Sequence, residues 1–189
     1  MRTYECKLAS VTPVAFGRFF SEEVPKGPKE NHDAYEKRTW MNRAHTTKEG
    51  NVFIPPLAFK NALTAIAKYL GEQIPGKGKS TYTKHFASGV LVTDPLILPV
   101  KKDDLKGQWI HVPADGVRGG SKRVLKCFPV IEEWSGSLLV TVLDETITEE
   151  VLKRHLIEAG NFIGVGSLRV QNNGIYGRFK VVDMKQVSA

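Results

Sequence analysis

The sequence predicts an α+β protein, in which an antiparallel sheet is backed by two helices and carries an inserted β-hairpin and a long exposed loop. Two observations support this class. Two segments repeat apolar residues at helical spacing, whereas several others alternate or run continuously in apolar and β-branched residues, as strands do. At 189 residues, with 41% hydrophobic and 9% aromatic residues, the chain is long enough for one well-buried domain and is unlike a disordered segment.

The N-terminal part is predicted to hold two strands separated by a loop. Residues 3–14 are rich in β-forming residues and alternate roughly, which indicates a strand. Residues 21–38 are mostly polar and contain proline and glycine, so we expect a long exposed loop there. Residues 38–46 are predicted as the second strand, and a turn at 49–51 closes it.

Two helices are predicted from apolar spacing and from their end signals. The first, 54–71, begins with prolines, which a first helical turn tolerates, and ends at a glycine. The second, 146–160, opens with Thr146 and Glu149 at capping-box spacing and stops at Gly160. The predicted apolar faces are Phe59, Ala62, Leu63, Ile66, Tyr69 and Leu70 in the first helix, and Val151, Leu152, Leu156 and Ile157 in the second.

The remaining strands are predicted from apolar runs at 89–100, 108–113, 122–131 and 136–144, with a closing strand at 174–184. Without the hairpin around 108–131, the order is strand, helix, strand, strand, helix, strand. This is the βαββαβ plan of ferredoxin-like, RRM-like domains.

A single domain is predicted, because no internal repeat or linker divides the chain. It spans 1–189, with insertions at about 15–51 and 101–131.

The charge balance favours a polyanionic partner, since 27 Lys and Arg against 20 Asp and Glu give a net charge of +7. Cys6 and Cys127 lie in apolar strand-like runs without CxxC spacing, which indicates buried free thiols in a reducing compartment. No apolar run has the length of a membrane span, and the N-terminus lacks a signal-peptide core. We therefore expect a cytoplasmic protein without a membrane partner.

The stretch "IPGKGKSTYTKHF" (74–86) tests one specific function, nucleotide binding by a P-loop. A P-loop requires a glycine, four residues and then Gly-Lys-Ser/Thr, between a strand and a helix. In one register Gly78 stands where the hydroxyl residue should be, and in the other Gln73 stands where the first glycine should be. The stretch also follows a predicted helix. It is interpreted as a basic loop that contacts a longer polyanion.

Two further stretches combine glycine with cations: "VPADGVRGGSKRVLK" (112–126) and the loop 164–178. Any one of the three is equally explained by a chain turn or a solvated face. If they share one side, they form an electrostatic track along a nucleic-acid backbone, with Tyr82 and Tyr176 placed to stack on unpaired bases. The predicted binding residues are Lys77, Lys79, Tyr82, Lys84, Arg118, Lys122, Arg123, Lys126, Gly164, Gly166, Arg169, Tyr176 and Arg178.

Two stretches resemble the RAMP superfamily of CRISPR effector subunits. "VFIPPLAFKNALTAIAKYL" (52–70) is similar to that superfamily's segment at the start of its first helix, and "FIGVGSLRVQNNGIYGRFKV" (162–181) looks like its C-terminal glycine-rich loop. Pro56 and Leu57 stand where the superfamily usually has glycine and serine. The resemblance implies a ferredoxin-like fold and RNA binding.

The chain as a whole also resembles a family of small proteins encoded by tailed bacteriophages. This similarity is clearest in 74–86, in "GVRGGSKRV" and in the C-terminal loop. It implies no activity.

His32 and His45 are candidates for acid–base catalysis of RNA cleavage, because both lie in polar segments beside charged residues. Their spacing does not require this role, and a non-catalytic protein is favoured over an enzyme. His85, His111 and His155 occur singly, without the spacing of metal ligands, so neither a metal nor a cofactor is predicted.

The sequence thus predicts a non-catalytic protein that binds single-stranded nucleic acid, RNA in preference to DNA, mainly through phosphates. Copies are expected to line up along the strand by head-to-tail self-association. Two alternatives stay open: a metal-independent ribonuclease using His32 or His45, and a phage factor that binds or imitates a host defence protein in the bacterial cytoplasm.

Overall fold

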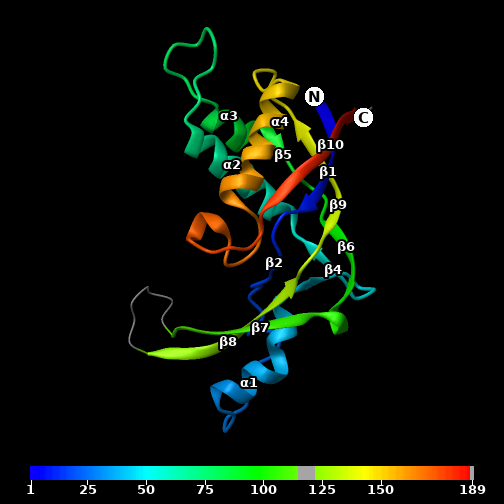
Figure 1. The fold of residues 1–189 in the computed structure, drawn as a ribbon, viewed down its shortest axis with the longest axis vertical. Coiled ribbons are helices and arrows are strands. Elements are labelled where there is room, and N and C mark those ends of the chain that lie inside the picture. The colour runs from blue at the N-terminus through cyan, green and yellow to red at the C-terminus, as the bar shows by residue number, and fades with distance from the viewer. Residues whose placement is uncertain (115–121, 188–189) are drawn as a thin grey trace.

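The computed structural model describes residues 1–114 and 122–187, and within them the predicted α+β class is confirmed (Figure 1). Helix α2 follows β1 along the chain, and helix α4 lies between β9 and β10. Every pairing in the main sheet is antiparallel. This sheet joins, in order, β10 (Phe179–Val187), β1 (Arg2–Ser10), β9 (Ser135–Val142) and β5 (Val90–Leu91).

Helices α2 (Pro56–Leu70) and α4 (Glu149–Glu158) begin and end where local chemistry dictates. Proline opens α2, and Gly71 closes it with a φ of 56°, in the left-handed region that glycine adopts most readily. The hydroxyl of Thr148 accepts a hydrogen bond from the Val151 N–H and caps α4. The predicted cap, Thr146, lies two residues too early.

The hydrophobic core lies between one face of the main sheet and the helices beside it. Tyr4, Cys6 and Leu8 are buried and alternate along β1 with more exposed residues, as expected for a strand covered on one face. Phe59 of α2 meets Phe179 of β10 edge-on, with ring centroids 6.0 Å apart. In Figure 1, α2 and α4 lie on one side of these strands and leave the other face open.

Three residues predicted for the apolar helix faces are wrong. Tyr69, Leu70 and Ile157 are 66%, 36% and 38% exposed, because each sits at the margin of its apolar stripe. Tyr69 instead stacks on the half-exposed ring of Phe162, at a centroid distance of 5.6 Å.

Two smaller sheets extend the body. The predicted strand 3–14 is interrupted before a short second strand, and the predicted strand 89–100 is divided between two sheets. One sheet joins β3 (His45–Thr46), β4 (Asn51–Ile54) and β6 (Leu96–Lys101), and the other joins β2 (Val14–Ala15), β8 (Arg123–Ile131) and β7 (Lys106–Pro113). The last two strands form the predicted hairpin.

Several helical segments lie where strands or loops were predicted. Helix α1 (His32–Thr39) occupies the second half of the predicted loop, because the side chain of Asn31 accepts a hydrogen bond from the Ala34 N–H and caps it. The predicted strand 38–46 begins with the end of α1 and continues as a 3₁₀ helix. Other short segments are the 3₁₀ helices Trp40–Arg43, Lys102–Asp104 and Val170–Asn172, and the π-helix Ala159–Ile163.

A further helix, α3 (Tyr82–Gly89), follows the basic turn and was not predicted. The ammonium of Lys60 on α2 stabilises its end: it donates to the carbonyl oxygens of Phe86 at 2.6 Å, Ala87 at 2.9 Å and Val90 at 2.7 Å. Lys60 belongs to the RAMP-like segment 52–70. Its contacts are structural ones.

Cys6 and Cys127 are buried and free, as predicted, and burial raises the pKa of each thiol to about 12. In the ranges 1–114 and 122–187, no helix is long and apolar enough to cross a membrane. The same residues include no group of three or more His, Cys, Asp or Glu side chains that could hold a metal ion.

Candidate nucleic-acid interface

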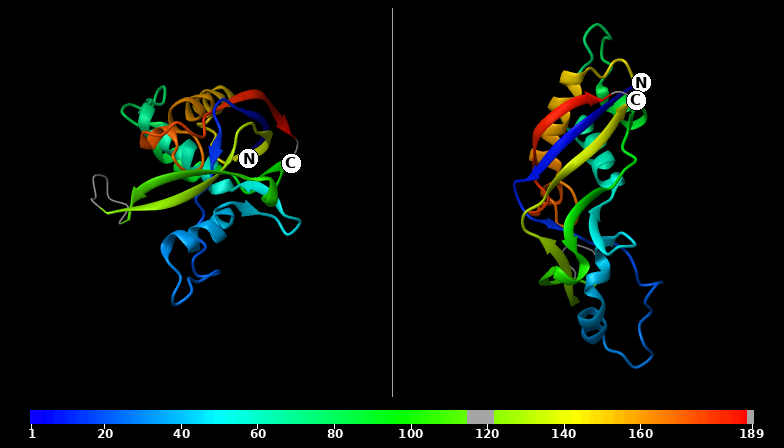
Figure 2. Two further views of the ribbon diagram at one scale, coloured as in Figure 1. Left: turned by 60° about the horizontal axis from the view of Figure 1, so that its bottom comes forward. Right: turned by 90° about the vertical axis from the view of Figure 1, so that its right-hand side faces the viewer.

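The three predicted basic stretches are spread along the long axis of the molecule. Figure 1 shows the turn between α2 and α3 near the upper end, the C-terminal loop 164–178 in the middle, and the β7–β8 hairpin in the lower half. Figure 2 (right) shows the same elongation, with the turn at one end and α1 at the other. Arg118 lies outside the described residues.

The turn at 74–80 is held by its own backbone. The Ile74 N–H donates to the Ser80 carbonyl oxygen at 2.9 Å, and the Lys77 N–H donates to that of Ile74 at 3.1 Å. The turn joins helix to helix, so the P-loop is excluded, as predicted. Lys77, Lys79 and Lys84 are exposed, and the Lys77 ammonium lies 3.0 Å from the Thr146 hydroxyl oxygen.

Tyr82 is a core residue, and its prediction as a base-stacking residue is wrong. The side chain is 3% exposed and packs edge-on against Phe86 and His155, at centroid distances of 6.4 and 5.6 Å. His155 is fully buried and lies on the ring of Phe86. Burial lowers the pKa of His155, and its Nε2 has no hydrogen-bond partner among the described residues.

The glycines of the C-terminal loop serve close packing within the chain. The Gly164 N–H, predicted to face phosphate, donates to the Ala159 carbonyl oxygen at 2.9 Å. Gly166 has a φ of 80°, and a Cβ there would lie 2.4 Å from the Ala15 carbonyl oxygen. The loop therefore needs these glycines to pack against the segment around β2.

The side chains of this loop remain candidates for nucleic-acid contact. Arg178 is exposed, and Arg169 and Tyr176 are half-buried and joined by a backbone bridge. Nε of Arg169 is buried and has no acceptor among the described residues.

The remaining predicted cations lie on what we call the arm, which consists of α1 and the β7–β8 hairpin (Figure 2). Lys122 and Arg123 are exposed near its tip, and Lys126 is half-buried. Because side chains alternate along a strand, Lys122 and Lys126 face one side of β8 and Arg123 the other. The hairpin thus carries cations on both faces.

Helix α1 covers the free edge of β8 with side chains that replace a neighbouring strand. The buried carboxylate of Glu36 accepts a hydrogen bond from the Cys127 N–H at 2.9 Å, and His32 Nε2 donates to the Leu125 carbonyl oxygen at 3.1 Å. Further along the same edge, the Phe16 N–H donates to the carbonyl oxygen of Pro129, which itself has no N–H to satisfy. The arm is therefore a built unit.

Glu36 also holds Arg43 in a fixed orientation. Nε and Nη2 of Arg43 donate to the two carboxylate oxygens of Glu36 at 3.0 and 2.8 Å, and both side chains are largely buried. The guanidinium lies over the rings of Phe20 and Phe128, at 5.4 and 5.9 Å from their centroids.

A cavity of about 210 Å³, which we call the arm pocket, opens beside this guanidinium. Phe20 and Tyr35, in its wall, stack at a centroid distance of 6.3 Å, whereas Phe19 is 73% exposed. Sequence reasoning missed this site, although the pair Phe19-Phe20 beside a polar loop was a usable signal. The pocket is lined by Phe19, Phe20, Ser21, Tyr35, Arg43 and Lys126.

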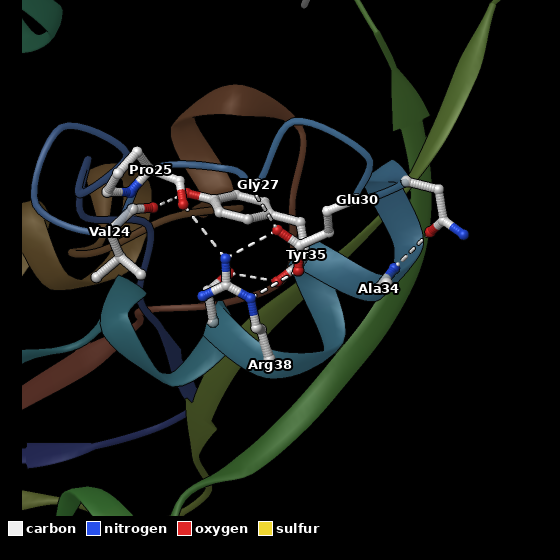
Figure 3. A network of polar contacts seen from close by, with 9 residues as sticks. Val24, Pro25, Gly27, Glu30, Ala34, Tyr35 and Arg38 are labelled. Carbon is white, nitrogen blue, oxygen red and sulfur yellow. Dashed lines mark hydrogen bonds and ion pairs between the residues drawn. The ribbon is translucent and has the colours of Figure 1, made fainter.

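The loop that carries the aromatic wall is tied to α1 (Figure 3). The Tyr35 hydroxyl donates to the Val24 carbonyl oxygen at 2.7 Å. Arg38 donates from Nε and Nη2 to the two oxygens of Glu30 at 2.6 and 2.8 Å, and the Gly27 N–H donates to the same carboxylate at 3.0 Å. The hydrogen bonds from Arg38 and Gly27 lower the pKa of Glu30 to about 2.

The two candidate catalytic histidines are not in one site. His32 is hydrogen-bonded to β8, whereas His45 lines a separate cavity of about 320 Å³ together with Arg18 and Lys102. Burial and the charge of Arg18 lower the pKa of His45, so its imidazole is neutral at pH 7. This arrangement provides one base beside cations.

The open face of the main sheet differs from an RNA-binding sheet that stacks bases on aromatic residues. The side chains on this face of β1 and β9 include Thr3, Glu5 and Lys7, and Leu139 and Thr141 opposite them. Nucleic-acid contact is therefore better provided for on the arm.

Comparison with protein-family models finds no match, and a search of curated proteins also finds none. Solved structures do match. The chain overlays the cryo-EM structure of the Type III-B Cmr-beta bound to cognate target RNA with a TM-score of 0.56 and 10% identity. This match covers 99% of the chain but only 61% of the Cmr-beta chain.

The crystal structure of Cmr6 from Pyrococcus furiosus matches with a TM-score of 0.51 and 12% identity, covering 95% of this chain and 97% of that one. At such low identity the likeness shows a shared fold. The chain thus has the fold of RAMP-type Cmr subunits, which supports the RAMP resemblance of its sequence.

Proposed function

We propose that the protein binds single-stranded RNA and that the arm is its main contact surface. The observation that carries this proposal is the fold shared with Cmr-beta, a complex bound to target RNA, together with the cations on the hairpin. Lys122, Arg123 and Lys126 contact successive phosphates in this proposal, and Lys77, Lys79, Lys84, Arg169, Tyr176 and Arg178 extend the contact along the body.

The test is fluorescence anisotropy of labelled single-stranded RNA, single-stranded DNA and duplex at several salt concentrations. Changing Lys122, Arg123 and Lys126 together to alanine should weaken binding and reduce the log–log salt slope by about 2, since each phosphate contact on a single strand contributes about 0.7. The matched control changes Lys7, Lys68 and Lys153, three exposed cations off the arm, and should leave the slope unchanged. Equal losses in both variants would contradict the arm as the interface.

The preference for RNA over DNA is part of the proposal and rests on the same fold match. It requires contacts to the 2′-hydroxyl, so a strand with 2′-deoxy positions should bind more weakly at every salt concentration. Equal affinity for the two strands would leave phosphate contact as the whole of the interaction.

Copies of the protein are proposed to bind side by side on a longer strand, in head-to-tail contact. The projecting arm supports this, because it extends away from the body and can reach a neighbouring copy (Figure 2). Mass photometry on RNAs of increasing length should then show stepwise addition of protein. A fixed stoichiometry of one copy on long RNA would exclude it.

A further inference from the structure

The arm pocket has the features of a site for a flat, partly polar ring. Its wall carries three aromatic side chains from two segments, Phe19 and Phe20 before α1 and Tyr35 within it. Phe20 and Tyr35 are buried and stacked nearly parallel, at an interplanar angle of 17°. Phe19, by contrast, is 73% exposed beside the cavity, so a ring face is accessible from outside. Exposed aromatic rings of this kind stack on unpaired bases.

The guanidinium of Arg43 supplies hydrogen-bond donors in a fixed orientation. Glu36 occupies one edge of the guanidinium, formed by Nε and Nη2. The other edge, formed by Nη1 and the second N–H of Nη2, has no acceptor among the described residues, and Arg43 lines the pocket. Two parallel N–H groups held in a plane match the O6 and N7 acceptors of guanine.

The charge of the pocket comes from Lys126. Glu36 neutralises the guanidinium charge of Arg43, whereas Lys126 has no ion-pair partner in the described part of the chain. Lys126 lines the pocket on the same face of β8 as Lys122. A phosphate beside the pocket would therefore lie on the row of cations proposed above.

We infer that the arm pocket holds one unpaired guanine of the bound RNA. The base stacks on Phe19, its O6 and N7 accept from the free edge of Arg43, and Lys126 contacts the adjoining phosphate. This inference rests on the proposed function. It adds a base preference at one position to binding that is otherwise independent of sequence.

The experiment compares 12-nucleotide oligouridine with strands that carry one central guanine, adenine or 7-deazaguanine. The wild-type protein should bind the guanine strand most tightly and lose the preference with 7-deazaguanine, because that base lacks the N7 acceptor. Phe19→Ala should reduce affinity for the guanine strand by about 5- to 150-fold, the effect of losing one base–aromatic stack. The exposure of Phe19 makes a folding defect in this variant a minor concern.

Phe162→Ala is the matched control, because Phe162 is a half-exposed phenylalanine on the π-helix, away from the arm. It should bind every strand as the wild type does. Equal affinity of the wild type for guanine and 7-deazaguanine strands, or no loss in Phe19→Ala, would overturn the pocket assignment while leaving RNA binding intact. Absence of binding to any single strand at low salt would overturn the proposed function and this assignment together.

Discussion

Replacing Glu36 by glutamine is expected to destabilise the arm strongly. The change keeps the shape of the side chain but removes the charge that compensates the buried guanidinium of Arg43, and it weakens three hydrogen bonds of 2.8 to 3.0 Å. Breaking a buried ion pair by removing one partner costs about 3–5 kcal/mol of unfolding free energy. In a chain of this size each kcal/mol lowers the melting temperature by about 2–4 °C, so we expect a decrease of about 6–20 °C.

Denaturant unfolding followed by tryptophan fluorescence suits this measurement, because Trp40 and Trp109 lie against each other in the arm, 6.3 Å apart. The double variant Glu36→Gln with Arg43→Gln should recover part of the loss, since no uncompensated charge then remains buried. A loss below about 1 kcal/mol in the single variant, the level of an exposed ion pair, would refute the assignment of this pair as the anchor of the arm.

Three further predictions concern stability and chemistry. Burial lowers the pKa of His155, so the unfolded chain takes up a proton below about pH 6.5 and the folded chain does not; unfolding free energy should fall by up to about 1.4 kcal/mol per pH unit on acidification. His155→Phe should remove this dependence in denaturant titrations at several pH values. The carboxylate of Glu30, with its pKa near 2, should stabilise the loop at neutral pH and lose this effect as the pH falls towards 2. Glu30→Gln should therefore speed proteolysis within residues 22–29 at neutral pH, and an unchanged cleavage rate would contradict the contacts of Figure 3. Labelled RNA incubated with the wild-type protein should stay intact on a denaturing gel, because His45 lacks a facing partner histidine; cleavage that stops in His45→Ala would establish the ribonuclease alternative.

The candidate site was only partly visible in the sequence. The cations of the hairpin could be predicted, because charge next to glycine in a polar stretch is a local property. Tyr82 was assigned wrongly, since a tyrosine beside a basic loop looks the same in sequence whether its ring faces solvent or packs under α4. The pairing of Glu36 with Arg43 and Cys127 joins residues up to 91 positions apart and leaves no local signal.

The fold shows the same division. Sequence alone determined the two helices of the main layer, the hairpin strands and the α+β class, because apolar periodicity and end signals act within a few residues. Tertiary structure decided the rest. Residues 38–46 form helical turns because Trp40 packs near Trp109, and the glycines at 164 and 166 are required by the backbone that they approach. The arm pocket exists only because distant segments meet, and such contacts depend on the whole packing of the chain.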